Sequence, residues 1–263
     1  HFNGPVICID KESKYFPVVM TDHYSAVKKL IAHLIDEHGY RDIAYLTGKK
    51  WHLHSKERLQ AYIDCMEEHS LPVREDRIFY GDFWYSSGEA MVDKLLKDRE
   101  NMPRAIACAN DCMAIGVAKA LEENGIHIPE EVAVVGYDST EEGKTSPKPI
   151  TSAPISAKEC GVHAAICIQA LFDGEPMPEF HAEVELFIGS SCGCHNDSVV
   201  PKLNLRENWS TDISEYSFYS CYNHMMEDML SKSQFKDLMN TIFTYVYQIR
   251  EFESFHLCLN SQW

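Results

Sequence analysis

The sequence predicts an α/β fold in which parallel β-sheets are flanked by helices. Short apolar runs alternate with amphipathic segments through the first two thirds of the 263-residue chain. Glycine follows two of the helical segments, at Gly39 and Gly125, where it can end a helix. Polar side chains follow the apolar runs, at the strand ends where ligands bind in such folds.

The expected elements follow one another in a regular order. We expect strands within residues 4–10, 42–48, 76–82, 103–110, 130–139 and 181–192. We expect helices within residues 23–39, 55–70, 86–98, 111–125 and 156–174. Apolar residues at helical spacing, such as Leu59, Ile63 and Met66, identify the helices. This repeated strand–helix order favours parallel sheets.

Composition and charge exclude several classes of function. The chain is 45% hydrophobic and 24% charged, so it can bury a core, and its formal net charge is −16. Such a charge repels polyphosphate, so we expect this segment to make no direct contact with nucleic acid. No apolar run reaches the ~20 residues that span a bilayer, and no signal peptide is recognised. Several of the ten cysteines lie in apolar runs, which favours reduced thiols and a cytoplasmic location.

The chain is expected to contain two parts. Residues 1–197 carry the alternating pattern, whereas residues 198–216 are polar and read as a linker. Two further stripes of apolar residues predict helices in the segment that follows, and the last residues alternate like the start of a strand. We therefore predict a domain over 1–197, and a linker, helices and the start of another domain over 198–263.

The predicted strand-to-helix junctions supply an arginine, an amide, two carboxylates and three aromatic rings. These groups suit a polar or polyhydroxylated small molecule, because polar atoms can bind hydroxyl groups and flat rings can stack on apolar faces. The candidate ligand-binding residues are Trp51, Arg58, Phe83, Trp84, Asn110, Asp111 and Asp138.

Ordinary structural roles remain open for the same residues. Asn110 and Asp111 open a helix, where these residue types are favoured as caps. Arg58 is also compatible with a solvated helix surface, and Phe83 and Trp84 with a core position.

Metal binding and catalysis are not expected. Cys192, Cys194 and His195 suggest zinc, but a structural site needs four ligands and no second pair with zinc-ligand spacing is evident. His52 and His54 are expected in a loop. The familiar nucleotide, hydrolase and metalloprotease motifs are missing from the sequence, so we predict no enzyme and no cofactor.

Three motifs in order, "HGYRDIAYLTG", "ANDCMAIG" and "IPEEVAVVGYD", resemble the effector-binding core of LacI/GalR-type proteins. The resemblance runs from about residue 5 to residue 195. It implies a periplasmic-binding-protein-like type I fold, in which two Rossmann-like lobes with parallel sheets close on an effector. The first lobe is incomplete, because its early strand–helix units and the DNA-binding headpiece are missing from this sequence.

The resemblance also implies roles for individual residues. Arg58 matches the arginine of the family's R-x-x-G-[YF] motif, here with Ala61 in place of the glycine. Asn110 and Asp111 match its "AND" element, Asp138 its G-[YF]-D aspartate, and Phe83 the aromatic residue after "GD". Ile155 and Ala157 stand where some sugar binders have polar or aromatic contacts, which argues against a simple sugar.

The main functional prediction is a ligand-sensing module of a cytosolic bacterial signalling protein. The string "GSSCGCH" resembles the end of this domain in such proteins, where a diguanylate cyclase or a histidine kinase can follow. The alternatives are the effector-binding core of a LacI-family transcription regulator, or a dimerisation scaffold with a degenerate cleft. The expected partners are a small-molecule effector and a second copy of the chain, with no membrane contact.

Overall fold

The computed structural model describes residues 4–154, 157–179 and 184–195, and a few positions between 205 and 241; the side chains of 157–159 are not described. Packing divides the chain into two units, His1–Trp209 and Ser210–Trp263. The predicted linker, helices and further domain over 198–263 lie almost entirely outside the described residues. The predicted boundary at residue 197 therefore stays a prediction.

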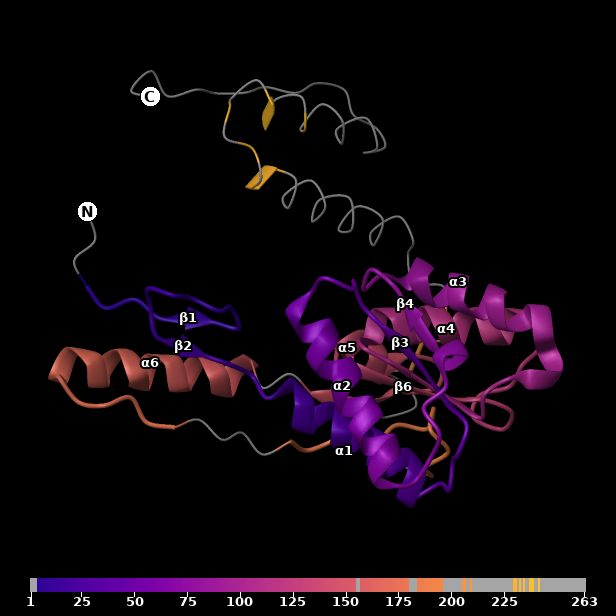
Figure 1. Cartoon of the computed structure of the whole chain (residues 1–263). Helices are drawn as coiled ribbons and strands as arrows, with labels where there is room; N and C mark the ends of the chain where they lie inside the picture. The colour runs from indigo at the N-terminus through magenta and orange to yellow at the C-terminus, as the bar shows by residue number, and fades with distance from the viewer. Residues whose placement is uncertain are drawn as a thin grey trace. The chain divides into compact units, whose positions relative to one another are not determined.

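The first unit is built on a five-stranded parallel sheet in the order β4-β3-β5-β6-β7 (Figure 1). Its strands are β3 (Ile43–Thr47), β4 (Ile78–Tyr80), β5 (Ala105–Cys108), β6 (Ala133–Asp138) and β7 (Thr151–Pro154). Strand β3 and strand β5 are buried at every position, as is expected of a sheet that is covered on both faces. The predicted α/β class and the parallel sheet are confirmed.

Helices cover both faces of this sheet. The helices are α1 (His23–Asp36), α2 (Leu53–Glu68), α3 (Tyr85–Leu95), α4 (Asp111–Glu123) and the short α5 (Glu141–Thr145). Two 3-10 helices, Glu75–Arg77 and Leu96–Asn101, complete the connections. Helix α1 packs on α2, and α3 packs on α4. Because crossovers between parallel strands are right-handed, α2 lies on one face and α3 and α4 lie on the other.

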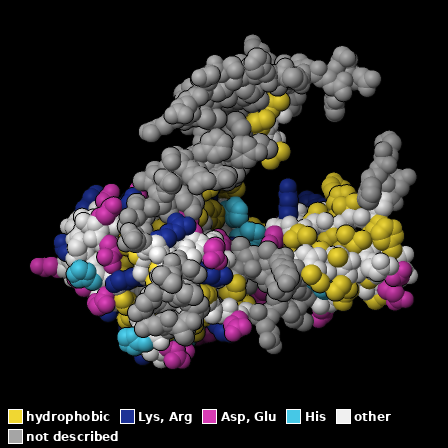
Figure 2. Space-filling view, turned by 180° about the vertical axis from the view of Figure 1, so that it is seen from behind, with side chains coloured by type: hydrophobic (Ala, Val, Ile, Leu, Met, Phe, Trp, Pro, Cys, Tyr) yellow, Lys and Arg dark blue, Asp and Glu magenta, His cyan; other side chains and the backbone are white. Residues whose placement is uncertain are grey.

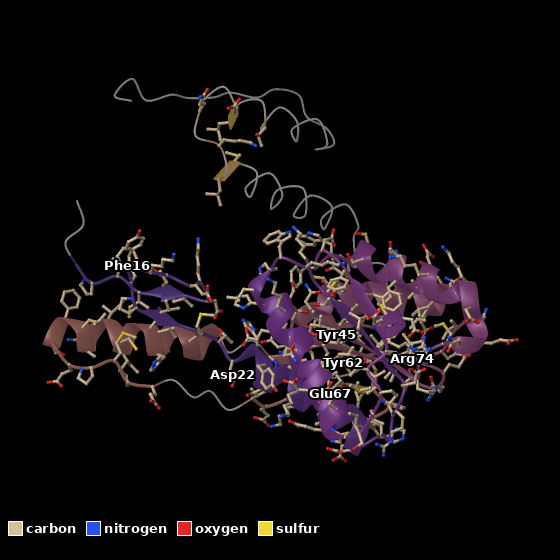
Figure 3. All side chains as sticks on the ribbon, in the orientation of Figure 1. Phe16, Asp22, Tyr45, Tyr62, Glu67 and Arg74 are labelled. Carbon is tan, nitrogen blue, oxygen red and sulfur yellow. The ribbon has the colours of Figure 1, made fainter. Side chains whose placement is uncertain are left out.

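Local sequence explains where the helices begin and what they bury. Asp22 caps α1, since its side chain accepts a hydrogen bond of 2.8 Å from the Ser25 amide. Gly39 follows the helix with a φ of +68°, which a residue with a side chain rarely adopts. In the core, the rings of Tyr45 and Tyr62 stack with centroids 4.9 Å apart (Figure 3). The Tyr62 hydroxyl donates to the Ile43 carbonyl at 2.8 Å, whereas the buried Tyr45 hydroxyl has no partner among the described residues.

A smaller part contains two parallel strands and one helix: β1 (Cys8–Ile9), β2 (Val18–Val19) and α6 (Ala157–Asp173). Its core is small and consists of Val19, Cys160, Ala164 and Cys167, with Ile7 and Met177 packed against them. Large apolar side chains remain exposed on it, among them Phe16, Val162, Ile166 and Phe172. Figure 2 shows this apolar surface from behind. Contiguous exposed apolar surface often marks a site of contact with another protein.

Some elements differ from the prediction. The strand predicted over 181–192 is wrong, because the described residues 184–192 make only one isolated antiparallel bridge, between Phe187 and Ser152. Strand β7 was not predicted; its residues are Thr, Ser, Ala and Pro, which do not form an apolar run of large side chains, but it pairs with β6 and is almost entirely buried. Burial by neighbours, and not β-propensity, therefore determines this strand. Among the described residues, no helix combines the length and the apolar character that crossing a membrane requires.

Candidate functional site

The candidate site lies at the carboxyl ends of the sheet strands, where α2 approaches the ends of β5 and β6. Arg58 of α2 is only 6% exposed, so it is not a solvated surface residue. Its Nη1 donates a hydrogen bond of 2.5 Å to the Ala109 carbonyl, and its guanidinium lies 3.9 Å from the centroid of the Tyr137 ring. A cation stacked on an aromatic face is favourable, and more so when it is buried. We call Arg58, His23, Ser55, Tyr137 and Asp138 the Arg58 cluster.

His23 is held by two members of this cluster. Its Nδ1 lies 3.2 Å from Arg58 Nη2 and 2.7 Å from the Tyr137 hydroxyl. Arginine can only donate, so Nδ1 is the acceptor and the proton of the neutral imidazole is on Nε2. Burial, and next the charge of Arg58, lower the pKa of His23 to about 3, so the ring is neutral at physiological pH. His23 Nε2 is then a buried donor with no partner among the described residues.

Two further polar atoms of the cluster are also buried without a hydrogen-bond partner among the described residues. Ser55 Oγ and Arg58 Nε are buried and have no hydrogen-bond partner in the described part of the chain. Such atoms are rare in folded proteins, because each one loses its water on folding without compensation. Their concentration in one place is typical of a site that pairs them with something outside the chain.

Asp138 completes the cluster with an acceptor. It is the last residue of β6 and adopts a φ of +99°, a strained conformation for a residue with a side chain. Its carboxylate makes no hydrogen bond to the described residues. Burial raises the pKa of Asp138 to about 7, and the charge of Arg58 opposes this rise. The structure thus holds a carboxylate that is poorly solvated and has no donor of its own.

Asn110 and Asp111 both have structural roles. Asn110 caps α4, with its side-chain oxygen accepting from the Met113 amide at 3.0 Å and its side-chain nitrogen donating to the Phe83 carbonyl at 2.9 Å. It is 7% exposed. The cap was one of the two alternatives for this residue, and the geometry confirms it. The link to Phe83 also ties the junction after β5 to the loop that follows β4.

Asp111 is fully buried, and both of its carboxylate oxygens accept hydrogen bonds from other residues of the protein. Oδ1 accepts from the Ser152 hydroxyl at 2.7 Å, and Oδ2 accepts from the amide and the hydroxyl of Thr140 at 2.6 and 3.0 Å. Burial raises the pKa of Asp111 to about 6, although these hydrogen bonds act against the rise. Asp111 therefore joins β7 to the start of α5, and its predicted contact with a ligand stays untested.

The aromatic candidates differ in their positions. Phe83 is half-buried, and its ring lies on Gly48, where a Cβ atom would be 2.1 Å from the ring. Trp84 is half-buried at the start of α3, and its amide donates to Asp82 at 3.1 Å. Trp51 is 72% exposed and is not part of the cluster in this structure.

Sequence reasoning missed three members of the site region. His23 belongs to no motif that points to binding, and Tyr137 is the aromatic residue of the G-[YF]-D motif, in which only the aspartate was given a role. Only the fold brings both residues to Arg58, which is 35 residues from His23. His54, expected in a loop, lies in the first turn of α2 with its ring 4.2 Å from that of His23. Helix α2 begins at Leu53, two residues before the predicted start at residue 55, and therefore includes His54.

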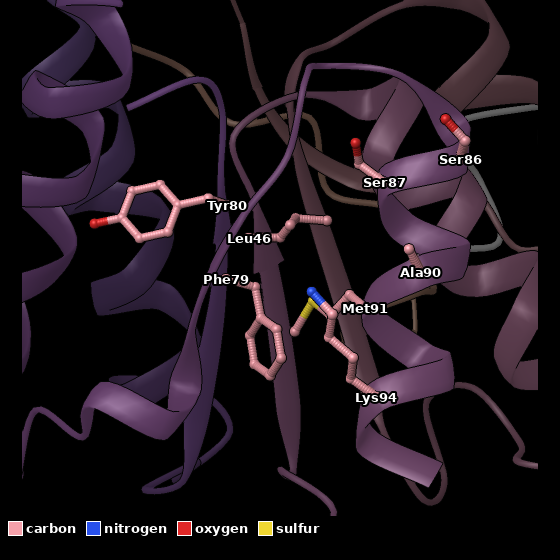
Figure 4. A pocket seen from close by; sticks show the side chains of 8 residues that line it. All are labelled: Leu46, Phe79, Tyr80, Ser86, Ser87, Ala90, Met91 and Lys94. Atoms are coloured by element: carbon pink, nitrogen blue, oxygen red, sulfur yellow. The ribbon is translucent and has the colours of Figure 1, made fainter. Parts of the chain in front are cut away.

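A separate cavity of about 260 Å³ lies between the strand ends and α3 (Figure 4). Its lining consists of Leu46, Phe79, Tyr80, Ser86, Ser87, Ala90, Met91 and Lys94. None of these residues belongs to the Arg58 cluster, so the cavity and the cluster are two distinct sites.

A parallel sheet with a buried polar cluster at its carboxyl edge is typical of small-molecule-binding α/β domains. The family model described as "Periplasmic binding protein-like domain" matches residues 31–192. This match covers more than half of the chain, and the chain belongs to that family. Its relatives and structural neighbours show that it is an effector-binding domain of the LacI/GalR type, as the resemblance predicted.

Two curated relatives of this chain are transcription repressors. The HTH-type transcriptional repressor PurR of Actinobacillus pleuropneumoniae serotype 3 (strain JL03) is 32% identical over 168 residues, which are 62% of this chain and 49% of the repressor. PurR of Vibrio parahaemolyticus serotype O3:K6 (strain RIMD 2210633) is 34% identical over 153 residues, 58% of this chain and 44% of the repressor. The chain thus spans about half the length of the curated relatives it matches.

Two solved structures similar to this chain are also regulators of the LacI family. A sugar-binding transcriptional regulator of the LacI family from Escherichia coli, complexed with phosphate, superposes with a TM-score of 0.65 at 29% identity, over 71% of this chain and 68% of that one. A regulatory protein of the LacI family from Chloroflexus aggregans has a TM-score of 0.66 at 28% identity, over 73% and 69% of the two chains. These relatives are regulators and not enzymes, in agreement with the expectation for this domain.

Proposed function

We propose that this domain is the effector-binding core of a LacI-family transcription regulator and that a small polar metabolite binds at the Arg58 cluster. The relatives named above are transcription regulators, which favours this alternative over the sensor of a signalling protein. The proposal includes a homodimer in the cytoplasm, the assembly and location that the family resemblance implies.

The observation that carries the proposal is the set of buried polar atoms without partners. The cluster offers donors at His23 Nε2 and Arg58 Nε, a hydroxyl at Ser55 and an acceptor at Asp138. A buried polar group without a partner costs about 1–3 kcal/mol, and a ligand that pairs with it removes that penalty. Hydroxyl and amide groups both donate and accept, so a sugar-like or nucleoside-like molecule matches this set.

Binding can be transmitted through the contacts of Arg58. Its bond to the Ala109 carbonyl connects α2 to the junction before α4, and Asn110 connects that junction to Phe83. A ligand that binds one arrangement of these elements more tightly shifts the domain towards it. In a repressor such a shift changes the relative position of the two lobes and, through them, DNA binding.

The test is a thermal-shift screen of the full 263-residue chain against sugars, nucleosides, nucleobases and other polar metabolites, followed by calorimetry on any compound that stabilises it. A compound present at 100 times its Kd should add about 2.7 kcal/mol of stability. Arg58→Ala and Asp138→Asn should each weaken the binding. Arg74→Ala is the matched control, because Arg74 pairs with Asp76 on the surface.

Two results would count against the proposal. Either no compound in the screen stabilises the chain, or a compound binds with the same affinity to the wild type and to both cluster variants. Sedimentation of the full chain tests the assembly, and a monomer at every concentration would contradict the homodimer.

A further inference from the structure

Four side chains with metal-binding atoms converge away from the Arg58 cluster. They are His33 in the last turn of α1, His38 just after that helix, and Cys192 and Cys194 in the turn near the end of the first unit. The Nε2 or Nδ1 and Sγ atoms of these four residues all lie within 4.8 Å of one another. We propose that these residues bind a zinc ion, which joins the end of α1 to the Cys192–Cys194 turn.

Three of the six separations between the ligand atoms are close to those of a tetrahedral zinc site. Cys194 Sγ lies 3.3 Å from His38 Nε2 and 3.5 Å from His33 Nε2. Cys192 Sγ lies 3.6 Å from His33 Nε2. With Zn–S bonds of about 2.3 Å and Zn–N bonds of about 2.0–2.1 Å, tetrahedral angles place sulfur and nitrogen ligands about 3.6 Å apart. The three observed separations are within about 0.3 Å of this value.

The backbone brings both sulfurs to the same side of the turn. Gly193, between the cysteines, has a φ of +106°, and its amide donates to the Ser190 carbonyl at 3.1 Å. A Cβ atom at this position would be 3.2 Å from the Tyr40 hydroxyl and 3.4 Å from His38 Nδ1. The positive φ favours glycine here, and a Cβ atom would also be in tight contact with the Tyr40 hydroxyl.

Surrounding groups hold the proposed ligands in place. The Thr151 hydroxyl donates to Cys192 Sγ at 3.0 Å, and the Tyr40 hydroxyl donates to the Cys192 carbonyl at 3.0 Å. The ring of Tyr40 also stacks on that of His38, with centroids 5.4 Å apart and planes 14° from parallel. Hydrogen bonds to a metal-bound thiolate and packing around the imidazoles are the outer contacts that orient ligands in known metal sites.

The ligand set indicates a structural role. Two cysteines and two histidines provide four protein ligands, which leaves no position for water or substrate on a tetrahedral ion. The turn they hold is already bonded to the sheet, since the Val134 amide donates to the Ser191 carbonyl at 2.9 Å. Zinc would fix the turn to α1 as well, so that residues distant in the sequence form one rigid end of the first unit.

Sequence spacing did not reveal this site, and the proposal replaces the expectation of no metal. The Cys–His separations along the chain are 156 and 161 residues for Cys194. His195, which suggested zinc in the sequence, is exposed and is not one of the four converging residues.

The test measures zinc on the full chain, purified without a polyhistidine tag and under reducing conditions. Elemental analysis should find about one zinc per chain. Replacement of zinc by Co²⁺ should give the visible bands of tetrahedral cobalt and a thiolate-to-metal charge-transfer band. Cys194→Ser and His38→Ala should lose the tightly bound metal.

Two variants serve as matched controls. Cys167 Sγ lies 3.3 Å from His163 Nε2, and no group of three or more metal-binding side chains includes this pair in the described part of the chain, so Cys167→Ser removes a cysteine with a similar histidine contact only. His195→Ala removes the exposed histidine next to Cys194. Both variants should keep about one zinc per chain.

The cobalt spectrum of the wild type keeps the test valid if a ligand variant fails to fold. Wild-type protein without zinc that also gives no thiolate-to-cobalt band would overturn the proposal. A disulfide between Cys192 and Cys194 that forms in preference to metal binding when zinc is supplied would overturn it too, as would full zinc content in the folded ligand variants.

Discussion

Replacing Asp138 by asparagine should stabilise the protein at alkaline pH and change its stability little near pH 4. Asparagine has the same shape and tolerates a positive φ, so the substitution removes the charge and little else. Poor solvation of the buried Asp138 carboxyl group destabilises the folded protein only when that group is ionised. The effect of the substitution should therefore follow the titration of Asp138.

The sign and the size follow from the pKa. Burial raises the pKa of Asp138 from 3.8 to about 7 in the folded protein. The folded state then holds the proton more tightly than the unfolded state, so the contribution of Asp138 to stability falls as the pH rises from about 4 to about 7. Each pKa unit corresponds to about 1.4 kcal/mol, which sets an upper value of about 4 kcal/mol. Because part of the side chain reaches solvent, we expect about 2–4 kcal/mol.

The assay is urea unfolding of the wild type and of Asp138→Asn at several pH values between about 4 and 8, without effector. The variant should gain stability over the wild type as the pH rises, and the difference should level off above about pH 7. The exposed Asp93 on α3 provides the control, since Asp93→Asn should show no such rise. A variant that is no more stable than the wild type at pH 8 would refute the reasoning.

Two further predictions concern packing around the site. Arg58→Met should destabilise the fold by about 2–4 kcal/mol in urea unfolding, because it leaves the buried Ala109 carbonyl without its hydrogen-bond donor. The control is Arg74→Met on the surface, which should change the stability by less than about 0.5 kcal/mol. Gly48→Ala should destabilise by about 1–3 kcal/mol, because the new methyl group meets the Phe83 ring. Adding Phe83→Ala should remove most of the Gly48→Ala effect in a double-mutant cycle, and additive effects of the two changes would contradict the contact.

Much of the fold could be predicted because hydrophobic periodicity and helix-ending residues are local signals. The expected helix over 111–125 is α4, Asp111–Glu123, with Asn110 as its cap. The expected strand over 130–139 contains β6, Ala133–Asp138. Strand β7 was missed because its burial depends on β6 and on the bridge of Ser152 to Phe187, which no local pattern encodes.

The candidate site could be predicted only in part. Arg58 and Asp138 lie in one cluster, and Asn110 follows Ala109, whose carbonyl accepts from Arg58, since parallel strands bring their carboxyl ends to one edge of the sheet. Their binding of a ligand stays a prediction. Trp51 was predicted by the same rule, but its side chain is exposed.

The sequence by itself determined the α/β class, the LacI/GalR-type family and the junctions that carry the candidate site, because these depend on local patterns and on motif order. The tertiary structure alone decided which polar atoms are buried without partners, that Asp111 is occupied within the protein, and that His33 and His38 meet Cys192 and Cys194. These properties depend on distances between residues that are far apart in the chain. Only the packing of the folded protein defines such distances.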